Sequence, residues 1–170
     1  MKKETKKEII IYGSLLIFVI LLRIFVITPV RVKGISMDDT LKDKQIMILN
    51  KISYKFTNPK RFDIIVINHE EDLIKRVIGL PGETLEYKDN ILYINGKEVE
   101  EPFLKQETKD FNITELGYDK IPDNCYIALG DNRSLSLDSR YYGCFTKEEI
   151  LGKTSLVIYP FKDFGYKNKN

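Results

Sequence analysis

A strand signal and a turn signal stand side by side in residues 73–83, Leu73-Ile74-Lys75-Arg76-Val77-Ile78-Gly79-Leu80-Pro81-Gly82-Glu83. The apolar and β-branched residues of the first half favour a strand, and the Pro-Gly pair that follows favours a turn. Side chains along a strand alternate between its two faces, so Lys75 shares a face with Leu73 and Val77. The pattern predicts an amine that faces inward. A lysine that protects an exposed sheet edge is the alternative.

Similar short apolar runs, separated by turn residues, continue through the chain after residue 30. The further strands that we expect are 45–49, 63–67, 84–87, 91–94, 97–99, 125–129 and 155–159. Asn95-Gly96 favours a two-residue hairpin, because both positions of a type I′ turn need positive φ. Thr146 and Glu149 match a capping box, which predicts a short helix over 146–151. The polar segment 100–120 is expected to be a loop-rich insertion, and the fold class is mostly β with an antiparallel or barrel-like sheet.

One apolar run, residues 9–27, differs from the others in length. As a helix it would match the thickness of the hydrocarbon core of a bilayer. Arg23 lies near one end, where its side chain can reach the headgroups. The run is longer than the apolar core of a cleaved secretory signal, and no small-residue cleavage site follows it. We therefore expect a single uncleaved transmembrane anchor over residues 9–28.

The charges around this anchor predict its orientation. Lys2, Lys3, Lys6 and Lys7 precede it, and the positive-inside bias keeps such a segment cytoplasmic. We expect a cytoplasmic N-terminus over 1–8, an extracytoplasmic β domain over 29–166 and a disordered tail over 167–170. The predicted localisation is the cell membrane, and one partner is the lipid bilayer.

Composition excludes two classes of function. The formal net charge is only +2, and basic and acidic residues are interspersed, unlike the basic face of a nucleic-acid-binding protein. The chain has one histidine, His69, which stands beside Glu70 and Glu71 in a predicted solvated turn. One histidine and two cysteines do not supply the ligands of a typical protein zinc site. We expect no nucleic acid, no metal and no cofactor.

The two cysteines, Cys125 and Cys144, fit neither a metal-ligand spacing nor the disulfide framework of a small secreted domain. We expect two buried, inert thiols. A disulfide between them is the alternative, because spacing alone does not show whether their Cα atoms approach.

Two residues are candidates for chemistry. A serine hydroxyl is a poor nucleophile until a base takes its proton, and with His69 on a predicted surface turn the candidate base is a lysine. A lysine can serve only if burial lowers its pKa from about 10.4, and Lys75 has the apolar flanks for this. Ser36, in Gly34-Ile35-Ser36-Met37 shortly after the anchor, would hold a nucleophile close to the membrane surface. A plain turn serine is the alternative.

Three stretches in this order, residues 34–41, 75–83 and 130–143, follow the single N-terminal span. They resemble the type I signal peptidases of bacteria, which cut signal peptides from exported proteins. The first is similar to the family pattern S/G-x-S-M-x-P-T-L, the second to K-R-V-I-G-L-P-G-D, and the third to G-D-N-R-x-x-S-x-D-S-R-Y-x-G. The resemblance covers nearly all of the chain beyond the anchor and implies the family's catalytic β domain.

The resemblance implies a role for each matching residue. Ser36 would be the nucleophile, Lys75 the general base, and Ser136 the hydroxyl that orients the lysine amine. An acyl-enzyme would form at the cleavage carbonyl, and water activated by Lys75 would release it. The residues implied as polar support are Asp131, Asp138 and Arg140.

The oxyanion site is only partly assigned. The backbone N–H of Ser36 is the first expected donor. Some family members supply a hydroxyl two residues before the nucleophile, and Gly34 holds that position here without one. The second donor is left open.

The expected substrates are secretory preproteins. By resemblance they are cut after small residues, with the peptide extended against a sheet edge. Candidate pocket residues are Ile35, Met37, Ile64 and Val66, for which ordinary core positions are the alternative.

The chain departs from the family pattern at two places. Asp39 replaces the expected proline, which removes a fixed φ and adds a charge near the site. Phe62-Asp63 stands where the family usually has Gly-Asp.

The sequence disfavours two other functions. A non-catalytic assembly factor with the same fold is disfavoured because Ser36, Lys75 and Ser136 are all present. A self-cleaving regulatory protease is disfavoured by the membrane span and by the absence of an N-terminal DNA-binding helical region.

Overall fold

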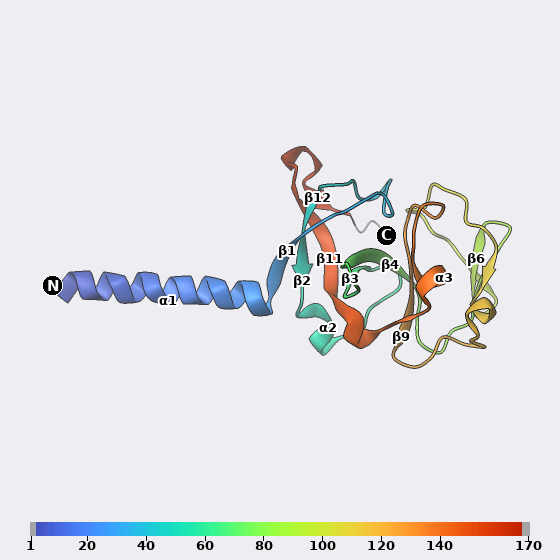
Figure 1. Cartoon of the computed structure of the whole chain (residues 1–170), viewed down its shortest axis with the longest axis horizontal. Helices are drawn as coiled ribbons and strands as arrows, with labels where there is room; N and C mark the ends of the chain where they lie inside the picture. Colours follow the sequence, from blue (N-terminus) through green and yellow to red (C-terminus); the bar gives the residue numbers. More distant parts are fainter. Residues whose placement is uncertain (1–2, 168–170) are drawn as a thin grey trace.

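A long helix projects from a β domain in the computed structural model, which describes residues 3–167 (Figure 1). Helix α1 spans Lys3–Phe25, and its residues 6–25 are long and apolar enough to cross a membrane, with none of them buried. Strand β1 begins at Ile27, so the last two residues of the predicted anchor belong to the sheet. Of the predicted tail, residues 168–170 lie outside the described residues.

The larger sheet carries the candidate site. Its strands are β1 (Ile27–Arg31), β2 (Ile46–Asn50), β3 (Ile64–Ile67), β4 (Leu73–Gly79), β9 (Cys125–Leu129), β10 (Phe145–Thr146), β11 (Ile150–Tyr159) and β12 (Gly165–Tyr166). Their order is β1-β2-β11-β3-β4-β9-β10, with β12 paired to β11, and each pairing is antiparallel. The sheet curls around the domain (Figure 1).

A smaller sheet lies at the end of the domain far from α1 (Figure 1). It contains β5 (Leu85–Lys88), β6 (Ile91–Ile94), β7 (Lys97–Val99) and β8 (Phe111–Asn112), in the order β7-β6-β5-β8. Asn95 and Gly96 connect β6 to β7 with φ of 51° and 72°. The predicted hairpin is confirmed. The short helical turns are α2 (Ser53–Phe56), η1 (Ile113–Leu116), α3 (Ser139–Tyr142), η2 (Lys147–Glu149) and η3 (Phe161–Asp163).

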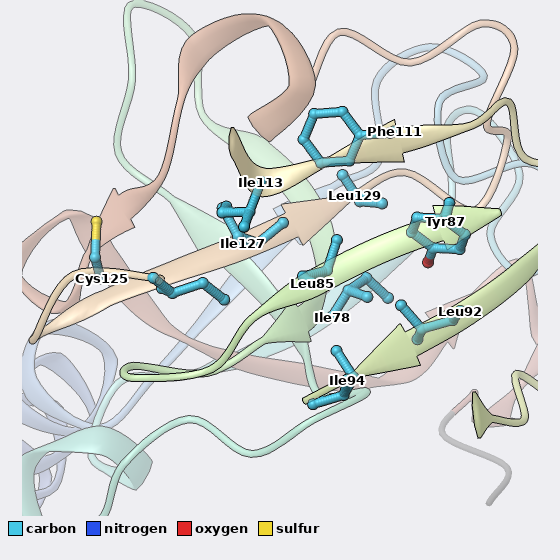
Figure 2. Close-up of a cluster of buried hydrophobic side chains, with 11 residues drawn as sticks. Ile78, Leu85, Tyr87, Leu92, Ile94, Phe111, Ile113, Cys125, Ile127 and Leu129 are labelled. Carbon is cyan, nitrogen blue, oxygen red and sulfur yellow. The ribbon is translucent and has the colours of Figure 1, made fainter. Parts of the chain in front are cut away.

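Strand β9 separates two hydrophobic clusters. Its residues Cys125, Ile127 and Leu129 join the cluster that packs the small sheet onto the large one, shown in Figure 2. The alternate residues Tyr126 and Ala128 join a second cluster on the opposite face. Because its side chains alternate between the two faces, β9 contributes to both clusters, and Gly130 follows directly at its end.

The expected strands are confirmed to within two residues at most ends, but β11 differs. It begins at Ile150, inside the helix predicted over 146–151. The capping box does form, and the Thr146 N–H donates to Glu149 at 2.7 Å, but it closes only the single turn η2. The following residues pair with β2 and β3 instead. The short strands β8, β10 and β12 and the edge strand β1, which contains Pro29, were not expected; a proline is tolerated at a sheet edge.

The prediction of two inert thiols is wrong. Cys125 and Cys144 form a disulfide, with their Cα atoms 5.7 Å apart. Cys125 begins β9 and Cys144 follows α3, so the bond closes a loop that contains all of residues 130–143. Sequence spacing could not reveal it, because the approach depends on α3 folding back beside β9.

We expect the Cys125→Ser/Cys144→Ser double variant to lose about 3 kcal/mol of unfolding free energy, because the crosslink restricts a loop of this length in the unfolded chain. Denaturant unfolding in detergent measures the change. Adding a reductant should destabilise the wild type to the same extent and leave the double variant unaffected. Equal stability of both proteins under oxidising conditions would contradict a disulfide that stabilises the fold.

Candidate active site

Strand β4 carries Lys75 into the interior. Lys75 is 2% exposed and pairs in register with Ile65 of β3. On the other side, β4 pairs with β9, which places Arg76 opposite Leu129. The inward-facing lysine predicted from the alternation is therefore confirmed, and the third sequence motif begins directly after the strand that neighbours β4.

The Lys75 amine forms a hydrogen bond to a serine of the third motif. Its Nζ donates to Ser136 Oγ at 3.1 Å. Burial lowers the pKa of Lys75 to about 8, because the ammonium form loses its hydration. The nearby carboxylates of Asp138 and Asp131 oppose this shift, whereas the Arg140 guanidinium adds to it. The result is an amine that is partly neutral near physiological pH.

The Ser36 turn is fixed by the residues on both sides of it. Gly34 has a φ of 76°, which favours glycine, and its N–H donates to Asp43 Oδ1 at 2.9 Å. Beyond Ser36, the side chains of Met37 and Leu41 are buried in a core cluster. Ser36 itself is partly exposed. The turn therefore presents this serine while its neighbours hold the backbone in place.

Gly130 is the point where the three motifs meet. A Cβ atom at Gly130 would lie well inside contact distance of Ser136 Oγ and of the Ser36 carbonyl oxygen. The N–H of Asn132 also donates to that carbonyl oxygen at 3.0 Å. The Ser36 backbone, the Ser136 hydroxyl and, through it, the Lys75 amine are thus gathered around one glycine.

Two groups of Ser36 are available for chemistry. Among the described residues, neither its hydroxyl nor its backbone N–H has a hydrogen-bond partner within the protein. A nucleophile and an oxyanion donor both need such availability, and contacts between a nucleophile and its base often tighten only when substrate binds. Gly34, whose N–H is held by Asp43, offers no second donor.

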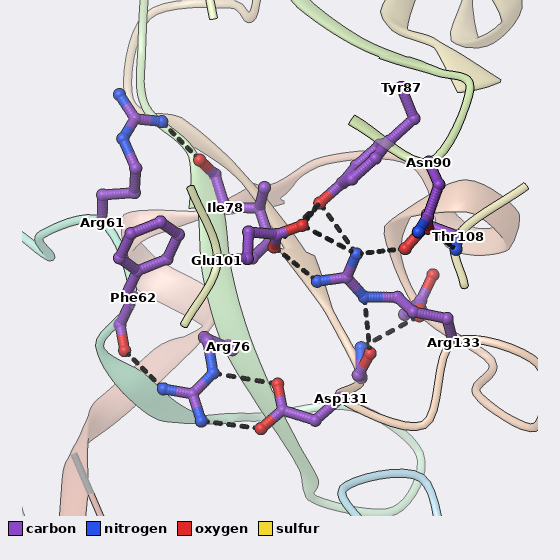
Figure 3. A network of polar contacts seen from close by, with 12 residues as sticks. Arg61, Phe62, Arg76, Ile78, Tyr87, Asn90, Glu101, Thr108, Asp131 and Arg133 are labelled. Carbon is purple, nitrogen blue, oxygen red and sulfur yellow. Dashed lines mark hydrogen bonds and ion pairs between the residues drawn. The ribbon is translucent and has the colours of Figure 1, made fainter. Parts of the chain in front are cut away.

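The residue after Lys75 forms a buried ion pair with the third motif (Figure 3). Arg76 donates to Asp131 through Nε at 2.9 Å and through Nη2 at 2.6 Å, and both side chains are about 1% exposed. Arg76 Nη1 also donates to the Phe62 carbonyl oxygen at 3.0 Å. Asp131 supports the site by fixing the strand that carries Lys75.

Asp138 and Arg140 support the loop on the other side of Gly130. Asp138 accepts the Gly130 N–H at 3.0 Å and two hydrogen bonds from Arg140 at 2.9 Å each. Burial acts to raise the pKa of Asp138, but the Arg140 guanidinium and the Gly130 N–H outweigh it and hold that pKa below its usual value. The carboxylate therefore stays charged and keeps the backbone at Gly130 in position.

Sequence reasoning missed the cluster around Arg133. This buried guanidinium bonds to Glu101 at 2.6 Å, to Tyr87 Oη at 2.9 Å, to Thr108 at 2.7 Å and to the Gly130 carbonyl oxygen at 3.1 Å (Figure 3). Arg133 belongs to the third motif, but Glu101 and Thr108 come from the segment expected to be an insertion. That segment therefore helps to fix the loop at Gly130. In the sequence, only Arg133 could have indicated this cluster, because it belongs to the third motif, whereas Glu101 and Thr108 belong to no motif.

The two departures from the family pattern have clear backbone consequences. Asp39 has a φ of 77°, which a proline ring excludes, so this turn takes a conformation unavailable to the expected residue. Phe62 has a φ of 69°, a value that favours the glycine usual at that position. The Phe62 ring packs edge-on against Phe103, with centroids 5.1 Å apart, and this contact offsets the backbone strain.

The other candidate residues lie as follows. Ile35 is 49% exposed beside Ser36, whereas Met37, Ile64 and Val66 are closed to solvent. Met37 and Ile64 belong to one core cluster. His69 is half-buried, not solvated as expected, and its ring stacks against Tyr142 with centroids 4.6 Å apart.

The chain combines a helix of membrane-spanning length, a curled β domain and a buried lysine that donates to the Ser136 hydroxyl, as expected of a membrane-anchored serine peptidase. The model of the family described as signal peptidase, peptidase S26, matches residues 5–159. The chain therefore belongs to the signal peptidase family.

Named relatives agree with this assignment. The chain is 44% identical to signal peptidase I of Bacillus caldolyticus, over 86% of this chain and 87% of that one. It is 37% identical to signal peptidase IB of Staphylococcus aureus strain MRSA252, over 98% and 95%. A crystal structure of a signal peptidase I from Enterococcus faecalis V583 superposes with a TM-score of 0.53 at 39% identity, covering 56% of this chain and 96% of that one.

We expect the rate of peptide cleavage to rise with pH as Lys75 loses its proton. Because burial lowers the pKa of Lys75 to about 8, kcat/KM should climb through an inflection near pH 8 and fall about tenfold per pH unit well below it. A pH profile between about pH 6 and 10 measures this. An inflection near 10.4, the value of an exposed lysine, or a flat profile would contradict the base assignment.

We expect Gly130→Ala to lower kcat/KM by roughly 100-fold or more, because the new methyl group would displace Ser136 or the Ser36 backbone. Gly13→Ala is the matched control, since nothing lies within 4 Å of a Cβ at that position. Near wild-type activity of Gly130→Ala would show that the three segments need not approach so closely.

Proposed function

We propose that this protein removes signal peptides from exported preproteins with Ser36 as the nucleophile and Lys75 as the general base. The observation that carries the proposal is the buried Lys75 amine, with its lowered pKa, hydrogen-bonded to Ser136 next to the Ser36 turn. Family membership adds the substrate class, because the matching family and both named relatives are signal peptidases.

The reaction begins with proton transfer. The neutral Lys75 amine accepts the Ser36 hydroxyl proton while Oγ attacks the carbonyl at the cleavage site. The Ser36 N–H donates to the developing oxyanion. The Lys75 ammonium then protonates the leaving amine, and the mature chain departs from an acyl-enzyme.

Deacylation uses the same base. Lys75 takes a proton from water, which attacks the Ser36 ester, and the Lys75 ammonium then returns a proton to Ser36 Oγ as the signal peptide is released as a carboxylic acid. Ser136 accepts a hydrogen bond from the Lys75 amine at 3.1 Å and so directs it toward the Ser36 turn. Asp131, Asp138 and Arg140 act through others as positioning residues, because their contacts fix β4 and the backbone at Gly130.

The anchor sets where this chemistry occurs. Lysines at the N-terminal end of α1 favour a cytoplasmic N-terminus, with the β domain on the opposite side of the cell membrane. A site shortly after the anchor suits a substrate whose apolar segment is itself in the bilayer. The assembly-factor alternative is not favoured, because the serine, the lysine and the orienting hydroxyl are all retained.

We expect Ser36→Ala and Lys75→Ala each to lower preprotein cleavage by on the order of 10⁴-fold or more, because either change removes a partner of the same proton transfer. Ser136→Ala should retain part of the activity, since it only orients the amine. Sequencing the new N-terminus of the product identifies the bond that is cut.

Ser134→Ala is the matched control for Ser136→Ala, because Ser134 is an exposed serine of the same loop that bonds to Asn132 and not to Lys75. Cleavage by a folded Ser36→Ala or Lys75→Ala protein at the wild-type rate would refute the assigned roles. Absence of cleavage by the folded wild type would favour the assembly factor.

A further inference from the structure

A groove leads from Ser136 over the small sheet. Its volume is about 990 Å³. Ser136 and Leu137 line it at the candidate site, and the turn between β5 and β6 and residues 107–111 line it beyond. The groove therefore begins at Ser136, the hydroxyl that bonds to the Lys75 amine, and is large enough for several residues of a peptide.

The position of the anchor tells which part of a substrate would enter this groove. Helix α1 and the small sheet lie at opposite ends of the molecule (Figure 1). A signal peptide has an apolar core that stays in the bilayer, on the side of α1. The exported chain beyond the cut runs away from the membrane. A groove that extends from Ser136 toward the small sheet thus lies on the side of the departing mature chain.

The groove is lined by carboxylates without ion-pair partners. Asp89, Glu107, Asp110 and Glu115 line it, are exposed, and make no salt bridge among the described residues. Two of the three cations that line the groove are already in ion pairs. Arg133 is paired with Glu101 and Arg140 with Asp138, which leaves Lys109 as the unpaired cation of the described lining.

We propose that this groove is a binding subsite for the first residues of the mature chain, and that its carboxylates favour lysine or arginine over aspartate or glutamate there. The subsite deepens the proposed function and rests on it. The exposed side chains of Leu137 and Tyr141 give the groove an apolar part against which the peptide stem can pack. The carboxylates around it supply the charge complementarity.

The expected size of this preference follows from the strength of exposed charge pairs. Each such pair contributes little in water, so exchanging lysine for glutamate opposite about two carboxylates should change kcat/KM roughly five-fold. Because these charges are exposed, the preference should weaken as ionic strength rises. This salt dependence separates an electrostatic subsite from a purely steric one.

The test uses the full chain in an uncharged detergent and preprotein substrates that differ only at roughly the second to fourth residue after the cut. Lysine, glutamine or glutamate is placed there, and kcat/KM is measured for each. The Glu107→Gln/Asp110→Asn double variant removes two carboxylates while asparagine keeps an acceptor for the Asp89 N–H, which bonds to Asp110. Glu98→Gln and Asp119→Asn, exposed acids outside the groove, are the matched controls.

We expect the wild type and both controls to prefer lysine over glutamate by roughly five-fold. The double variant should reduce this ratio to less than about two-fold, and Lys109→Gln should increase it. Equal kcat/KM for the three substrates, or an unchanged ratio in the double variant, would overturn the subsite and leave the peptidase function intact. Failure of the folded wild type to cut any of them would instead overturn the proposed function itself.

Discussion

The absence of a side chain at Gly130 is the constraint on which the candidate site depends. The Ser36 carbonyl oxygen and the Ser136 side chain both occupy space that a Cβ would fill. Gly130 also uses both of its backbone groups, because its N–H bonds to Asp138 and its carbonyl oxygen to Arg133. A position that is both sterically closed and doubly hydrogen-bonded has little freedom to move. The close approach of the Ser36 turn to Ser136, the hydrogen-bond partner of the Lys75 amine, therefore depends on the missing side chain at Gly130.

Buried charges surround this point, and their pairing explains why Lys75 can become neutral. Arg76 is neutralised by Asp131, and Arg133 by Glu101, with all four side chains almost inaccessible. Breaking such a pair would leave an uncompensated charge in the interior, at a cost of about 3–5 kcal/mol. Because the carboxylates near Lys75 are already committed to arginines, they oppose but do not cancel the effect of burial on its pKa. The ion pairs thus fix the geometry without holding the amine in its charged form.

Local sequence patterns predicted the longer interior strands and the inward direction of Lys75, since alternation and turn chemistry act over a few residues. They failed where distant segments decide the outcome. The helix expected after Thr146 became one turn because the next residues pair with β2 and β3. The disulfide between Cys125 and Cys144 and the salt bridge from Arg133 to Glu101 depend on contacts that no local pattern encodes. Ser36 and Lys75 were candidates from local chemistry as well as from the motif resemblance and Ser136 from the resemblance alone, whereas the packing role of Gly130 became visible only in three dimensions.

The burial of Lys75 has a consequence for the timing of activity. The residues that enclose its amine include Ser136 and the strand β9, which come much later in the chain than β4. Until they are in place, the lysine is hydrated and keeps the high pKa of an exposed amine. A nascent or partly folded chain therefore contains Ser36 but not the neutral lysine that the proposed mechanism needs. In the proposed mechanism, the base becomes available only when the fold is complete, because the same packing that buries the Lys75 amine also lowers its pKa.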